Sequence, residues 1–118
     1  MDRQVTFIGT FRIPDRDAWL PAIERMSAFV RDNVPGVRSF RAYVSDDGTE
    51  GTVVYVHPDG DSLDQHLATA ARLIQEGQAM VEVLRIDLLG SPNPGTVERM
   101  RGLGVPVSVK AHVVGFER

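Results

Sequence analysis

The sequence predicts a single α+β domain, and three observations carry this prediction. Segments rich in β-branched and aromatic residues alternate with two long segments whose apolar residues repeat at helical spacing. Proline and glycine mark most of the boundaries between these segments. The chain has 118 residues, of which 42% are hydrophobic and 25% charged. This length and composition fit one globular domain spanning residues 1–118.

The first two elements are a predicted strand and a predicted helix. Residues 5–13, VTFIGTFRI, favour a strand and stop at a proline. Asp15 and Asp17 can cap the helix that follows, and Pro21 is tolerated only near its first turn, so we expect a start at Asp17 or the next residue. The helix must end by Val34, before a Pro-Gly pair. Its apolar face consists of Trp19, Ile23, Met26 and Val30.

A β-hairpin is predicted next. Residues 37–45 and 51–57 flank the turn at 46–49, where Asp-Gly supplies the positive φ angles of a tight turn. The resulting register places Phe40 opposite Tyr55 on the more apolar face. The same register pairs Ala42 with Val53 on that face, and Arg41 with Val54 and Tyr43 with Thr52 on the other.

The rest of the chain contains a second long helix, a strand, a short helix and a last strand. We expect Asp61 to cap the second helix and Gly77 to end it. A strand over residues 80–89 follows, and Asn93 can cap a short helix over residues 96–101. We expect the last strand over residues 107–116 to run antiparallel to its neighbour. The buried stripe of the second long helix is Leu63, Leu67, Ala70 and Ile74.

This order is β-α-β-β-α-β, a ferredoxin-like arrangement, with an extra short helix and a C-terminal strand. Both long helices should cover one face of the sheet. We expect the other face to be apolar and to carry Val54, Val56 and members of the set Val81, Val83, Val107 and Val109. Because an uncovered apolar sheet is a liability, we expect a homodimer whose sheets pack face to face.

The composition limits the kinds of chemical site, location and binding partner that we expect for this protein. There is no cysteine, which excludes disulfides, thiolate nucleophiles and cysteine metal sites and favours a cytoplasmic location. The net charge of −3 argues against nucleic acid as a partner. No apolar run approaches the ~20 residues that span a membrane, and the N-terminus lacks the pattern of a signal peptide.

The strand-to-helix junction over residues 53–70 resembles that of the antibiotic biosynthesis monooxygenase-like family, above all in the stretch SLDQHLA at residues 62–68. The resemblance implies the dimeric α+β barrel fold, with a cleft between sheet and helices in each subunit. Some members of that family oxidise quinols or aromatic polyketides with oxygen and no metal or flavin, and others degrade heme. The heme-degrading members pair the helix histidine with a nearby tryptophan and a first-strand asparagine. This chain has no tryptophan or asparagine at those places, since Trp19 lies on the first predicted helix, so heme chemistry is not expected.

Four residues are candidates for the cleft. His66 lies at the edge of the apolar stripe, where an imidazole can transfer protons; the alternative is a boundary histidine that reaches water. The Tyr55 phenol could hydrogen-bond a ligand oxygen, with Phe40 and Trp19 as a flat wall for a ring. The alternative is that all three aromatic residues only fill the core.

Arg85 is the candidate anchor for an anionic substrate, and the alternative is an ion pair with Asp87 on the same strand face. A metal site is not expected, because the aspartates near His57 and His66 are explained as turn and cap residues. No cofactor is expected. The sequence thus predicts a dimer that binds a hydrophobic or aromatic small molecule, either as a cofactor-independent monooxygenase of phenols or quinols or as a non-catalytic ligand-binding or stress-related protein. A cavity below about 300 Å³ would favour the second function, and the role of residues 90–106 is left open.

Overall fold

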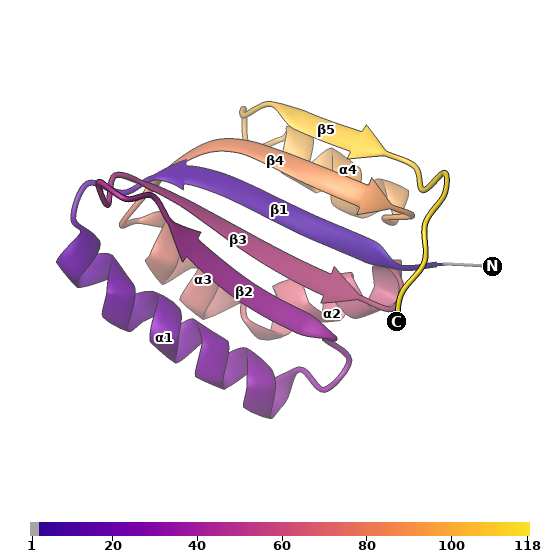
Figure 1. Cartoon of the computed structure of the whole chain (residues 1–118), viewed down its shortest axis with the longest axis horizontal. Helices are drawn as coiled ribbons and strands as arrows, with labels where there is room; N and C mark the ends of the chain where they lie inside the picture. The colour runs from indigo at the N-terminus through magenta and orange to yellow at the C-terminus, as the bar shows by residue number, and fades with distance from the viewer. Residues whose placement is uncertain (1–2) are drawn as a thin grey trace.

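The computed structural model describes residues 3–118, which form one mixed sheet with its helices on one side (Figure 1). The strand order is β2-β3-β1-β4-β5. The strands are β1 (Val5–Arg12), β2 (Ser39–Val44), β3 (Glu50–His57), β4 (Glu82–Gly90) and β5 (Val107–Lys110). The helices are α1 (Arg16–Asn33), α2 (Gly60–Thr69), α3 (Ala71–Gln78) and α4 (Pro94–Arg101). The predicted ferredoxin-like α+β fold with an added short helix and strand is confirmed.

The β2–β3 hairpin has the predicted register. Phe40 lies opposite Tyr55 and Arg41 opposite Val54. Gly48 takes the positive φ of the turn, at 76°. The hairpin was predictable because a tight turn determines which residues pair.

Helix α1 begins one residue earlier than expected. Asp15 is the cap, and its carboxylate accepts the backbone N–H of Ala18 at 3.3 Å. Pro21 therefore lies in the second turn, on the exposed side of the helix. The predicted apolar face is confirmed, since Trp19, Met26 and Val30 are buried.

The second long helix is divided at Ala70 into α2 and α3. Its cap is Asp59, which accepts the N–H of Ser62 at 2.8 Å, and not Asp61 as expected. Leu63 and Ala70 of the predicted stripe are fully buried. Because of this break, α3 does not continue straight on from α2. It lies beside α1, at one side of the cavity described below.

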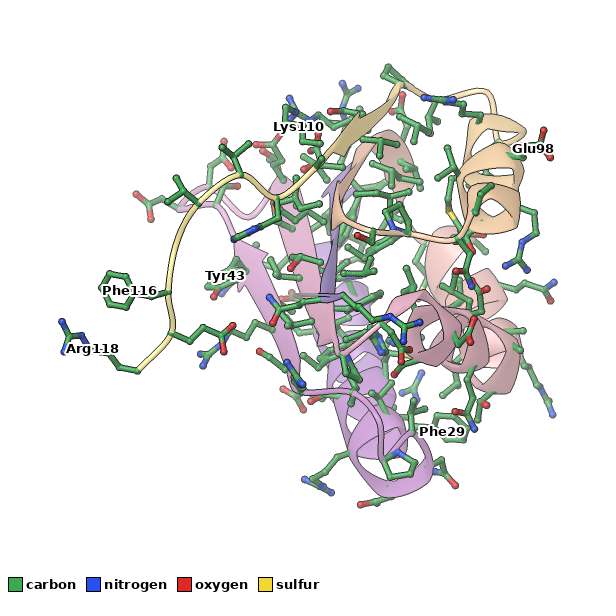
Figure 2. The ribbon with its side chains drawn as sticks, turned by 90° about the vertical axis from the view of Figure 1, so that its right-hand side faces the viewer. Phe29, Tyr43, Glu98, Lys110, Phe116 and Arg118 are labelled. Carbon is green, nitrogen blue, oxygen red and sulfur yellow. The ribbon has the colours of Figure 1, made fainter. Side chains whose placement is uncertain are left out.

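Strand β5 differs from the prediction in direction and length. It runs parallel to β4, with Ile86 opposite Val107, because α4 carries the chain back to the start of β4 before β5 begins. It ends at Lys110, and residues 111–118 continue as exposed chain without regular structure. Figure 2 shows Phe116 and Arg118 of this tail on the side of the sheet away from the helices.

The helix-free face of the sheet is composed differently from the prediction. Val83 pairs with Phe11, and Val107 pairs with Ile86, so both belong to the helix-covered face and pack against its core. The pairing of β1 with β4 shifts by one residue between Thr10, which pairs with Arg85, and Phe11. This shift places Val83 on the helix-covered face. The helix-free face carries Ile8, Val54, Val56 and Leu89, all half-buried, together with threonines and Tyr43.

Candidate functional site

A cavity of about 300 Å³ lies between the sheet and the helices. The sheet contributes Phe7, Gly9 and Tyr55, and α1 contributes Trp19. The other walls come from α2, α3 and α4. Gly9 opens the sheet side, since a Cβ there would lie 3.2 Å from the Phe7 ring. This volume is at the lower end of the range for small-molecule sites. A cavity below about 300 Å³ would have favoured the non-catalytic alternative, and this cavity is not below that size.

Tyr55 is the central residue of a stack of three rings. Its ring lies 5.0 Å from Phe7 on one side and 5.0 Å from Phe40 on the other, with nearly parallel planes. The stack follows from strand register, because Tyr55 pairs with Phe7 of β1 and with Phe40 of β2. These contacts hold the Tyr55 ring in one orientation at the cavity wall.

Tyr55 lines the cavity, and no residue within 3–118 forms a hydrogen bond with its hydroxyl. The residue is 7% exposed. Burial raises the pKa of this phenol well above its usual value, so the group is neutral and can donate a hydrogen bond.

Trp19 and Phe40 do not form one wall as expected. Trp19 lines the cavity and packs against Phe11, with ring centroids 5.6 Å apart. Phe40 lies on the far side of Tyr55 and borders a separate hollow beside Val30. Phe40 therefore supports Tyr55 from behind.

Arg85 is outside the cavity. It lies on the helix-free face of the sheet and donates two hydrogen bonds to Asp87, at 2.9 and 3.1 Å. Asp87 is 6% exposed, and the Arg85 side chain covers it. The structure thus shows the ion pair that the sequence offered as the alternative, and Arg85 is not near any other candidate site residue.

Two histidines form a buried pair behind the ring stack. His57 Nε2 lies 2.9 Å from His66 Nδ1, and His57 Nδ1 lies 2.8 Å from the hydroxyl of Ser62. Both imidazoles are completely buried. The His66 ring lies 4.6 Å from the Tyr55 ring. Its Nε2 atom has no hydrogen-bond partner within residues 3–118.

Both histidines are neutral at pH 7. Burial lowers the pKa of His57 to about 4, against a smaller opposing effect of Asp59. Burial, reinforced by His57, lowers the pKa of His66 to about 4 as well. A neutral pair shares one proton across the 2.9 Å contact, and the chain of contacts continues through Ser62 to the protein surface.

Sequence reasoning missed His57 and Ser62 as members of this group. His57 is the last residue of β3, in agreement with the predicted strand over residues 51–57, but no role at the site was expected for it. A usable signal was present, because His57 has the same strand parity as the buried Val53 and Tyr55. The position of His66 also differs, since it is enclosed and not at an edge of the helix face.

A polar network joins α2 to α4. Asp64 accepts hydrogen bonds from Thr96, from Asn93 at 2.8 Å and from Arg99 at 3.4 Å. Asn93 also donates to Asp61 at 2.8 Å. Through this network α4 is held where Met100 can line the cavity. Residues 94–101 therefore close one side of the site, and this is one role of the segment 90–106.

Within residues 3–118 there is no group of three or more histidines and acidic residues that could hold a metal ion. In the same part of the chain, no helix has the length and apolar character needed to cross a membrane.

The sequence matches no family model and no curated protein, but several solved structures share the fold. MupZ from Pseudomonas fluorescens is similar with a TM-score of 0.71 and 21% identity, over 98% of this chain and 95% of its own. SnoaB from Streptomyces nogalater, a cofactor-independent oxygenase, has a TM-score of 0.65 and 19% identity, over 77% of this chain and 95% of its own. A protein described as an antibiotic biosynthesis monooxygenase has a TM-score of 0.64 and 19% identity, over 75% and 99%. The chain therefore has the fold of the antibiotic biosynthesis monooxygenase-like proteins, as the resemblance at residues 62–68 predicts.

Proposed function

We propose that this protein binds a phenol or quinol in the cavity and oxidises it with molecular oxygen, without a metal or an organic cofactor. The observation that carries the proposal is the apolar, ring-lined cavity, whose wall includes Tyr55, a residue with no hydrogen bond to its hydroxyl within residues 3–118. Trp19 provides a second aromatic surface for the ligand ring. The similarity to SnoaB, a cofactor-independent oxygenase, supports the same reaction class.

The neutral Tyr55 hydroxyl would donate a hydrogen bond to the ligand oxygen and so stabilise the phenolate form. A phenolate is electron-rich enough to react with oxygen directly. For a phenol with a free para position, one oxygen atom replaces the two hydrogens of the dienone tautomer as a carbonyl. The other oxygen leaves as water, so that phenol and O₂ give quinone and H₂O.

His66 is the proposed proton acceptor. It is unprotonated at neutral pH, because burial holds its pKa at about 4. The phenolic proton would reach it through the Tyr55 hydroxyl, and would continue to His57 and Ser62. This transfer requires Tyr55 and His66, whose ring centroids are 4.6 Å apart, to come into hydrogen-bond contact when ligand is bound.

A second candidate is ligand binding without catalysis. The observation that favours it is the position of His66, which is fully buried and is not among the residues that line the cavity. Such a protein would bind the same aromatic molecules and leave them unchanged.

We also propose that the protein is a homodimer joined through the helix-free face of the sheet. Half-buried Ile8, Val54 and Val56 lie in the centre of that face, and Tyr43 is 53% exposed beside them. Phe116 of the C-terminal tail is exposed on the same side (Figure 2). Light scattering after gel filtration tests this proposal, and a stable species of 13 kDa, the mass of one chain, would contradict it.

The enzymatic proposal is tested by measuring oxygen consumption and ligand binding with a panel of phenols and quinols. The two tyrosines of the chain offer a matched pair of variants. We expect Tyr55→Phe to lower affinity and oxygen consumption about tenfold or more, and Tyr43→Phe to change neither, because only Tyr55 lines the cavity. Binding without oxygen consumption across the panel would support the second candidate, and no binding at all would contradict both.

A further inference from the structure

The cavity has one charged residue in its lining within residues 3–118, and that residue is Arg99. It lies in the last turn of α4. Two glutamines of α3, Gln75 and Gln78, are the remaining polar residues of the helix side, and Tyr55 is the polar residue of the sheet side. The lining thus has a neutral donor from the sheet, a cation from the last helix, and apolar groups between them.

Arg99 is held loosely. One guanidinium nitrogen lies 3.4 Å from a carboxylate oxygen of Asp64, and the side chain is 60% exposed. Asp64 already accepts hydrogen bonds from Thr96 and Asn93. Because exposed ion pairs contribute little and Asp64 has better partners, the guanidinium can leave this contact at small cost.

We propose that Arg99 is a specificity-determining residue that binds a carboxylate of the ligand. The ligand would then be an aromatic acid, with its phenolic oxygen at Tyr55 and its carboxylate at Arg99. This inference rests on the proposed function, since it requires an aromatic ligand in the cavity.

The chemistry favours a carboxylate for two reasons. A guanidinium presents paired N–H groups that match the two oxygens of a carboxylate, and such charge-assisted bonds are stronger than neutral ones. No acidic residue lines the cavity within residues 3–118, so a ligand cation meets no partner in the lining, and the carboxylate that competes with a ligand anion for Arg99 is that of Asp64, outside the lining.

The test compares two probes that share a hydroxynaphthalene ring system and differ by one carboxylate, 2-naphthol and 6-hydroxy-2-naphthoate. Their binding is measured by fluorescence titration at pH 7.5 and low salt. For the unchanged protein we expect the carboxylated probe to bind about tenfold more tightly. Arg99→Met should remove this preference and leave the affinity for 2-naphthol within about twofold. Arg101→Met is the matched control, because Arg101 is an exposed arginine of the same last turn that does not line the cavity.

Asp64→Asn separates a ligand contact from a structural role. If Arg99 binds ligand, loss of the competing Asp64 charge should raise the preference for the carboxylated probe while Arg99→Met abolishes it. If Arg99 only helps to hold α4 against α2, both substitutions should weaken both probes together, and the inference is wrong. Circular dichroism of each variant checks that it is folded, and Arg99→Lys, which keeps the charge, should retain part of the preference.

Equal binding of the two probes by the unchanged protein would overturn this inference and leave the proposed function standing. Binding of neither probe would overturn both. A preference that persists in Arg99→Met would place the anion elsewhere and would also overturn the inference.

Discussion

The buried histidine pair predicts a large loss of stability in mild acid. His57 and His66 are completely buried, and their pKa values in the folded protein are about 4. In the unfolded chain a histidine titrates near its ordinary value of about 6.5. The unfolded state therefore binds more protons than the folded state between these values. The stabilising contribution is present above pH 6.5 and is lost as the pH falls toward 4.

The magnitude follows from the size of the shift. Lowering a pKa from 6.5 to about 4 corresponds, over the whole titration, to about 3 kcal/mol per histidine. Between pH 7.5 and pH 5.0, where most of the difference develops, each histidine contributes about 2 kcal/mol. Acidification from pH 7.5 to pH 5.0 should therefore lower the free energy of unfolding by about 4 kcal/mol through the two histidines together. This is a large share of the roughly 5–15 kcal/mol that stabilises a typical domain.

Urea unfolding at pH 7.5 and pH 5.0 measures this loss. With an m-value of about 2 kcal/mol/M, the midpoint should fall by about 2 M. His66→Phe, which removes one titrating group from the pair, should reduce the difference between the two pH values by about half. His112→Asn is the control, because His112 is exposed and should leave the difference unchanged. Equal midpoints at the two pH values, or imidazole titrations near pH 6.5 in nuclear magnetic resonance spectra of the folded protein, would refute the reasoning.

Four other substitutions, one of them a matched control, have expected outcomes. Gly90→Ala should cost about 2 kcal/mol or more in urea unfolding, because φ is +102° at this position and a Cβ would clash with the backbone oxygen of Gln4. Gly95→Ala is the control, because a Cβ there meets nothing within 4 Å, and it should be neutral or slightly stabilising. Val54→Glu should convert the proposed dimer to a monomer in sedimentation velocity while the chain stays folded, and a dimer that survives would place the interface elsewhere. Ser62→Ala should cost about 1–3 kcal/mol in urea unfolding, because it leaves Nδ1 of the buried His57 without its partner; an unchanged midpoint would argue against that hydrogen bond.

The parts of the fold that the sequence predicted are those decided by local chemistry. The Asp-Gly turn sets the hairpin register, so the opposition of Phe40 and Tyr55 could be derived before the structure. The direction of β5 could not, because it depends on how α4 packs against α2 and returns the chain to the start of β4. The break at Ala70 also lacks a local signal, since alanine favours helices and the apolar spacing continues through it.

The candidate site was only partly predictable for a similar reason. Tyr55 and Trp19 could be identified because an aromatic residue on a buried face is visible in the pattern of one element. Arg99 could not, because its place at the cavity depends on the packing of α4, far along the chain from the sheet residues it faces. Arg85 was misleading, because the aliphatic residues around an arginine in a strand do not show which face of the sheet the arginine occupies.

The short stretch that carries the family resemblance also explains how the site is held together. Ser62 and His66 are four residues apart on α2, so they share a helix face, and both contact His57 of β3. Asp64 lies between them in sequence and points the other way, toward Asn93, Thr96 and Arg99. Helix α2 thus binds the sheet with one face and α4 with the opposite face, and the cavity depends on both connections. Because the two sets of contacts share no side chain, substitution of Asp64 should change ligand preference without changing the acid sensitivity, and substitution of His66 should change the acid sensitivity without changing the contacts of Arg99.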